Sequence, residues 1–113
     1  MAVDATIIAA FHAMWDSFPT RARLIQKDRT VLAVNKAAAA QGNQVGVRCV
    51  EEPPKEGHAG CLANQALRER TACYGLTNNK KRLRFWIPVE GCDDVFVHFS
   101  IPTEGLFPAE AEM

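Results

Sequence analysis

The sequence predicts an α+β domain built on a five-stranded antiparallel sheet, with short helices on one face and an N-terminal helix packed on the other. Two observations lead to this prediction. Several short segments rich in β-branched and aromatic residues are separated by turn-forming residues, which is typical of antiparallel strands. Other segments carry apolar or alanine residues at helical spacing, and they do not alternate regularly with the strands as in a parallel sheet.

The first expected element is an amphipathic helix over Asp4–Ser17, within an N-terminal segment of residues 1–18. Its apolar side chains recur at three- and four-residue spacings and form one stripe: Ile7, Ile8, Phe11, Met14 and Trp15. Pro19 ends the helix, because the residue before a proline is pushed out of helical geometry. The apolar stripe needs a partner, and we expect it to pack on one face of the sheet.

The predicted core, residues 19–103, begins with a hairpin of two strands, Arg21–Gln26 and Thr30–Val34. Asn35 follows directly and is a good N-cap for a short helix over Lys36–Gln41, whose alanines favour helix. Residues Glu51–Gly60 are too rich in proline and glycine for regular structure. We expect them to form a surface loop.

The second half of the core contains a helix over Cys61–Arg70 and a strand over Thr71–Leu76. Two longer strands, Arg82–Val89 and Val95–Pro102, then form a second hairpin around a polar, glycine-containing turn. Residues 104–113 are expected to form a flexible tail.

Both faces of the second hairpin carry large apolar side chains, so each face needs a cover. One parity is expected to face the short helices and the other to face the N-terminal helix or a second subunit. The predicted ligand-binding residues between the sheet and the short helices are Val34, Leu62, Leu67, Phe85, Ile87, Val97 and Phe99. The predicted association surface consists of Ile8, Phe11, Trp15, Trp86, Phe96 and His98.

Length, charge and hydropathy limit the classes of function that this chain can have. The 113 residues fit one domain with a proper core. Thirteen basic residues balance thirteen acidic ones, so no global charge attracts nucleic acid or an anionic membrane. The sequence has neither an apolar run long enough to span a bilayer nor a signal-peptide layout, and we expect a cytoplasmic protein with reduced thiols.

One stretch resembles a known family. A strand ending in Val34-Asn35 and followed at once by Lys36-Ala37-Ala38-Ala39 is similar to the strand-to-helix signature of PAS sensory domains. The stretch Gly46–Cys49 resembles the glycine-led segment that follows this helix in the family. The later elements also fall in the family's order over residues 19–103.

The resemblance implies a five-stranded antiparallel sheet whose inner face and short helices enclose a ligand pocket. It also implies that the N-terminal helix packs outside the sheet and often pairs two subunits, which predicts a homodimer. PAS domains usually accompany a kinase, a cyclase or a DNA-binding module, so the chain is expected to be a fragment of a larger sensor or to act on a partner such as a kinase or a transcription regulator. The identity of the ligand or cofactor does not follow from the sequence.

A subset of PAS domains carries a cysteine, an acidic loop and a Cys-x-x-Cys pair before the third strand. The resemblance places Cys49 and Cys61 at two of these positions and His58 at the first position of the pair. Such a mixed nitrogen and sulfur set suits zinc or iron. The alternative is two half-buried thiols and a loop histidine.

A basic cluster over Asn78–Arg84 has two interpretations. Its lysines and arginines are able to meet phosphates, but a solvated turn beside a strand edge explains them more simply. Phosphate-cradling, nucleophile-elbow, zincin and dinucleotide-binding motifs are missing from the sequence, so catalysis is not expected. Three hypotheses follow: a ligand-binding sensory domain, a ligand-free homodimerisation module, and a metal or redox site at Cys49, His58 and Cys61.

Overall fold

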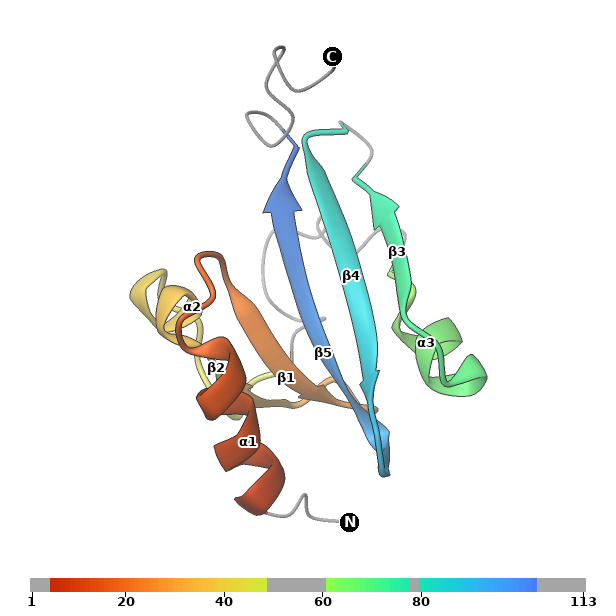
Figure 1. Ribbon diagram of the computed structural model, residues 1–113, viewed down its shortest axis with the longest axis horizontal. Coiled ribbons are helices and arrows are strands. Elements are labelled where there is room, and N and C mark those ends of the chain that lie inside the picture. The colour runs from red at the N-terminus through yellow and green to blue at the C-terminus, as the bar shows by residue number, and fades with distance from the viewer. Residues whose placement is uncertain (1–4, 49–60, 78–79, 104–113) are drawn as a thin grey trace.

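The computed structural model describes residues 5–48, 61–77 and 80–103 (Figure 1). Its elements are α1 (Ala5–Trp15), β1 (Ala22–Gln26), β2 (Val31–Val34), α2 (Lys36–Ala40), α3 (Ala63–Glu69), β3 (Cys73–Leu76), β4 (Arg82–Val89) and β5 (Cys92–Pro102). The strands form one five-stranded sheet in the order β2-β1-β5-β4-β3, and all neighbours pair antiparallel. Within these residues, no helix has the length and apolar character needed to cross a membrane.

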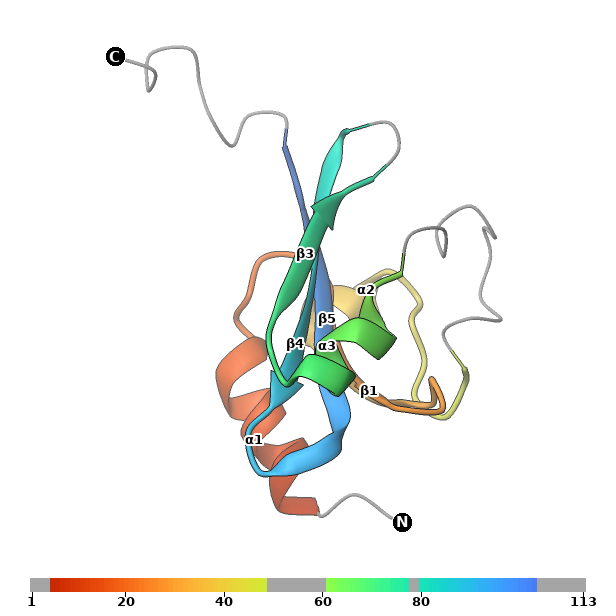
Figure 2. The ribbon, with the colours of Figure 1, turned by 90° about the vertical axis from the view of Figure 1, so that its right-hand side faces the viewer.

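The sheet separates two hydrophobic clusters. Figure 2 views the sheet from its side and shows α1 on one face and α3 on the other, which we call the α1 face and the α3 face. The buried residues on the α1 face are Phe11, Ala22, Leu24, Ala33, Val95 and Val97. The buried residues on the α3 face are Ile25, Val31, Ala63, Ala66, Leu67, Cys73, Trp86 and Phe96. The sheet is therefore covered on both sides, as its apolar content requires.

The predicted fold class is confirmed: an α+β domain with a five-stranded antiparallel sheet, an N-terminal helix and short helices packed on it. The start of β5 differs from the prediction, because this strand begins at Cys92 and the turn contains only Glu90 and Gly91. Gly91 has a φ of 78°, a left-handed conformation that suits glycine, and it lets Val89 pair with Cys92. The predicted loop and tail at residues 51–60 and 104–113 lie outside the described residues.

The assignment of hairpin parities to the two faces was wrong and is reversed. Val97 and Phe99 lie on the α1 face, together with Phe85 and Ile87, which pair with them across the strands. Trp86 and Phe96 lie on the α3 face, together with His98, which pairs with Trp86. Alternation along a strand shows which side chains share a face, but it does not show which helix covers that face.

Side-chain volume explains the arrangement. The buried side of α3 is made largely of small residues, Ala63 and Ala66, so it fits over the large rings of Trp86 and Phe96. On the other face, the bulky Phe11 of α1 lies in one cluster with the small Ala22 and Ala33 and with the larger Leu24, Val95 and Val97. Close packing combines large and small side chains in this way.

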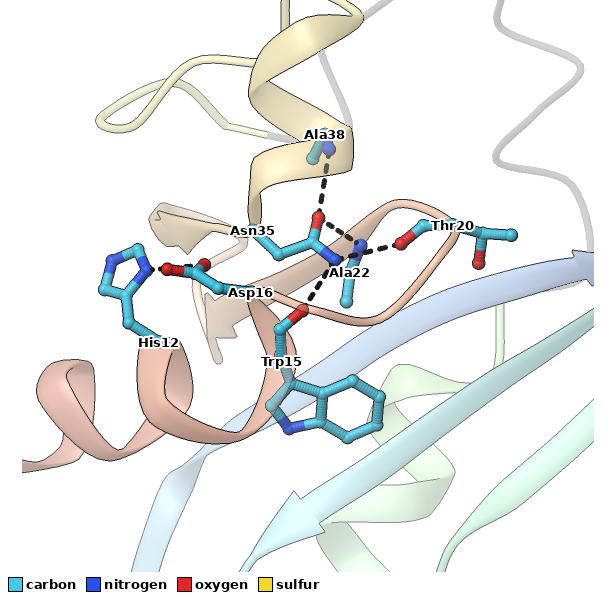
Figure 3. A network of polar contacts seen from close by, with 7 residues as sticks. All are labelled: His12, Trp15, Asp16, Thr20, Ala22, Asn35 and Ala38. Carbon is cyan, nitrogen blue, oxygen red and sulfur yellow. Dashed lines mark hydrogen bonds and ion pairs between the residues drawn. The ribbon is translucent and has the colours of Figure 1, made fainter.

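One buried amide joins three of the elements (Figure 3). Asn35 is fully buried, and its side-chain oxygen accepts hydrogen bonds from the backbone nitrogens of Ala22 at 3.0 Å and Ala38 at 2.9 Å. Its side-chain nitrogen donates to the carbonyls of Trp15 at 3.0 Å and Thr20 at 2.9 Å. The predicted N-cap of α2 is confirmed. The same side chain also ties the end of α1 to the start of β1.

We expect Asn35→Ala to destabilise the fold by about 3 kcal/mol or more, because each unsatisfied buried backbone group costs roughly 1 to 3 kcal/mol. Asn35→Asp keeps the acceptor oxygens but cannot donate to Trp15 and Thr20, so it is also expected to be destabilising. Urea unfolding measures both effects. The control is Asn64→Ala, an exposed amide on α3 that bonds Arg29. A similar small change in Asn35→Ala and Asn64→Ala would contradict the role of Asn35.

Candidate functional site

The seven predicted ligand-binding residues do not gather at one place. Val34, Leu62 and Leu67 lie on the α3 face, as expected. The other four lie on the α1 face: Phe85, Ile87, Val97 and Phe99. The ligand site proposed from the sequence is therefore corrected, and the α3 face must be described from the residues that occupy it.

The part of the α3 face directly beneath α3 is filled by side chains. Trp86 and Phe96 have exposed fractions of 2% and 1%, and Ile25 and Val31 are buried beside them. This half of the face is a packed hydrophobic core. It supplies stability and a rigid floor rather than polar recognition.

The neighbouring part of the α3 face is polar and basic. Arg23 of β1 pairs with His98 of β5, and Arg84 of β4 pairs with Ser100 of β5, so these side chains share the face that carries Trp86. Arg82 lies two residues before Arg84 and bonds Ser100. All five side chains are half-buried. We call Arg23, Arg82, Arg84, His98 and Ser100 the polar patch.

His98 is the central residue of the polar patch. Its ring stacks on the Trp86 ring, with centroids 4.9 Å apart and planes at 13°. Its Nδ1 lies 2.8 Å from the carbonyl oxygen of Phe85. Because a carbonyl only accepts, Nδ1 carries the proton in the neutral ring and Nε2 keeps a lone pair.

The environment of His98 keeps its imidazole neutral near pH 7. Burial is the main cause and lowers the pKa from 6.5 to about 4. The hydrogen bond to Phe85 opposes this shift, whereas the charges of Arg23, Arg84 and Arg21 add to it. These three arginines therefore act with burial against protonation of the ring.

Two arginines of the polar patch are held in place by defined contacts. The guanidinium carbon of Arg84 lies 5.3 Å from the centroid of the Trp86 ring, which is a cation–π contact. Arg82 donates from Nε to the Ser100 hydroxyl at 2.8 Å and from Nη2 to the Ser100 carbonyl at 3.1 Å. These contacts hold the guanidinium groups of Arg82 and Arg84 in defined positions on the sheet.

The polar patch does not follow from the sequence pattern alone. Arg82 and Arg84 were predicted to belong to a solvated turn beside a strand edge, but β4 lies between β5 and β3 in the interior of the sheet. A usable signal was present, because both arginines have the same parity as Trp86, and Arg21 and Arg23 alternate in the same way before β1 and within it. Arginines that repeat on one parity of central strands indicate a charged area on one face.

The proposed metal site is only partly covered by the described residues. Cys49 and His58 lie outside them, and Cys61 is exposed. Within residues 5–48, 61–77 and 80–103, no group of three or more His, Cys, Asp or Glu side chains is close enough to hold a metal ion.

The predicted association surface is divided between the two faces. Phe11 is buried under α1, and Ile8 and Trp15 pack against the same cluster. The other three members lie on the opposite side of the sheet: Trp86, Phe96 and His98. These six residues therefore do not form one continuous surface.

The α1 face instead has an aromatic row that is half-buried near α1 and exposed at Tyr74. Figure 1 shows α1 on the β1 and β2 side of the sheet, whereas β4 and β3 lie on the other side of β5. Ring contacts run from Trp15 to Phe99 at 5.1 Å, from Phe99 to Phe85 at 4.8 Å and from Phe85 to Tyr74 at 6.0 Å. Tyr74 and its neighbour Leu76 are 67% and 50% exposed. The row ends in apolar side chains that face solvent.

Comparison of the chain with protein-family models, with curated proteins and with solved structures finds no match.

The burial of His98 predicts a pH-dependent stability. Its folded-state pKa lies below its unfolded value, so between pH 6.5 and about 4 the unfolded chain binds more protons at this site. The contribution is complete above pH 6.5 and is lost as pH falls towards 4, by on the order of 2 to 3 kcal/mol. Urea unfolding over this pH range, compared between wild type and His98→Gln, isolates the effect. His12→Gln, at an exposed histidine, is the control. If the free energy of unfolding changed equally with pH in wild type and in His98→Gln, the assignment of this effect to His98 would be contradicted.

Proposed function

We propose that this protein is a cytoplasmic sensory domain of the PAS type, which binds a small ligand on the α3 face and signals through contacts with another protein. The strand order β2-β1-β5-β4-β3 and the short helices on the α3 face support this proposal together with the sequence signature around Asn35. The observation that carries it is the half-buried polar patch beside α3. Polar groups beside an apolar floor are typical of small-molecule sites.

The connection between the α3 face and α1 gives the proposal a route for the signal. Arg23 and His98 belong to paired strands, and Ala22, the residue before Arg23, donates its backbone N–H to Asn35. Asn35 also holds the C-terminal end of α1 through Trp15. A ligand that shifts β1 therefore biases the position of α1, provided that its affinity differs between the two positions.

The proposed mechanism contains no chemical step. The ligand binds, the equilibrium between two arrangements of α1 changes, and a partner such as a kinase or a transcription regulator responds.

Native mass spectrometry of the purified protein tests the sensory function. We expect an additional mass or a ligand released on denaturation, and we expect its occupancy to fall in His98→Ala, because the patch loses its central ring. Leu76→Ala, at an exposed position on the α1 face, is the matched control and should keep the ligand. A bound metal would instead support the site at Cys49, His58 and Cys61. Protein that carries no small molecule, even after incubation with cell extract, would contradict the sensory function.

A second candidate function is homodimerisation through the α1 face, and the aromatic row is the observation that favours it. Tyr74 and Leu76 are exposed at the uncovered end of this row, and Phe85 and Phe99 continue it towards α1. Exposed apolar side chains that adjoin one another mark association surfaces more often than isolated ones do. This surface differs from the association surface predicted from the sequence: it contains hairpin residues of the opposite parity to Trp86, Phe96 and His98.

Tyr74→Glu and Leu76→Glu test this second function. Each change places a carboxylate in the proposed interface, where burial of an unpaired charge is unfavourable, so we expect a dimeric wild type and monomeric variants. Sedimentation equilibrium measures the masses. Val45→Glu, at a 59% exposed residue between α2 and α3, is the control and should remain dimeric. A monomeric wild type, or dimeric variants at both positions, would exclude this interface.

A further inference from the structure

We infer that the polar patch on the α3 face binds a small organic anion through its arginines, with a carboxylate or a phosphate group as the recognised chemistry. This inference rests on the proposed ligand-binding function and gives the ligand a chemical class. The patch combines cations from two strands with neutral hydrogen-bonding groups on the strand between them.

The register of the sheet brings the cations to one place. Arg23 is on β1 and Arg84 is on β4, and both strands flank β5, which carries His98 and Ser100. Adjacent strands lie about 5 Å apart, so the two backbones are roughly 10 Å apart and two extended arginine side chains reach a common point above β5. Residues on one parity of three adjacent strands therefore converge on one small volume.

The electrostatics of His98 agree with this placement. The register puts Arg23 opposite His98 and Arg84 two residues before Trp86 on the same face, and the charges of Arg21, Arg23 and Arg84 lower the pKa of His98. Arg82 lies nearby through its two bonds to Ser100. Several arginines therefore lie on this part of the sheet, although the whole chain has no net charge.

The chemistry of the groups selects an oxyanion. Guanidinium groups present several N–H donors in a plane and bind carboxylates and phosphates in bidentate fashion. Arg21, Arg23 and Arg84 also make other contacts, but each guanidinium has five N–H donors and can serve two partners. The Ser100 hydroxyl accepts from Arg82 and can donate its own proton to an anion.

The half-buried position strengthens the preference for an anion. Hydrogen bonds between guanidinium groups and an oxyanion are stronger on a partly desolvated surface than in water. Arg82 and Arg84 are already held in place, so their side chains lose less conformational entropy when a ligand binds. Trp86 supplies a rigid aromatic floor beneath the site.

Nuclear magnetic resonance titration of the whole chain with sodium phosphate and, separately, with sodium citrate tests the inference at constant ionic strength. We expect saturable shifts of the Nε–H signals of Arg23 and Arg84, and the anion that binds more tightly identifies the recognised group. Bound anion also offsets the arginine charges, so the pKa of His98 should rise on binding. Anion binding at arginines remote from His98 would not raise the pKa of His98.

Variants localise the site. We expect Arg23→Gln and Arg84→Gln each to weaken binding roughly tenfold or more, because each removes a charge-assisted contact. Arg68→Gln, on the exposed side of α3 where it pairs with Glu69, is the matched control and should bind like wild type. Arg23→Gln leaves the Arg84–Trp86 contact in place, so it reports on binding even if Arg84→Gln unfolds.

The outcomes separate this inference from the sensory function. Saturable binding that depends on Arg23 supports both. Absence of saturable binding by either anion overturns the anion site, as does binding that is equal in wild type, Arg23→Gln and Arg84→Gln. If native mass spectrometry then finds a neutral ligand that depends on His98, the anion inference fails and the sensory function stands. If neither anion nor any other small molecule binds, both fail.

Discussion

The hydrogen bonds of the Asn35 side chain hold together the end of α1, the start of β1 and the first turn of α2. An amide is the only uncharged side-chain group that offers two donors and acceptor capacity in one plane, and here both halves are used. The side chain is fully buried, so water does not replace these partners. The position of α1 on the sheet therefore depends on a residue that belongs to neither.

This junction lies at one edge of a sheet that is packed on both faces. The α1 face combines Phe11 of the helix with both alanines and larger aliphatic residues of the strands, and the α3 face combines Ala63, Ala66 and Leu67 of the helix with large rings of the strands. Both arrangements satisfy the same requirement for close packing. Because β5 lies at the centre of the sheet and pairs with both β1 and β4, its side chains contribute to the clusters on both faces.

The polar patch occupies an area where the α3 face changes from apolar to basic. Placing several arginines and a neutral histidine beside a hydrophobic core costs free energy, because charges lose hydration there. A chain that needed only a stable core would gain more from apolar residues at Arg23, Arg84 and His98. The arrangement is understandable if the patch recognises a ligand, and the contacts of Arg82 and Arg84 keep it ordered before binding.

Local sequence determined most of the elements. Alternation predicted the strands, the alanine run predicted α2, and Asn35 was identified as its N-cap because these signals act over a few residues. The choice of face was decided only by the tertiary structure, since it depends on how helix and sheet volumes fit together. The same holds for the candidate site: Arg23 and Arg84 are far apart in the chain, and only the register of β1, β5 and β4 brings them to His98.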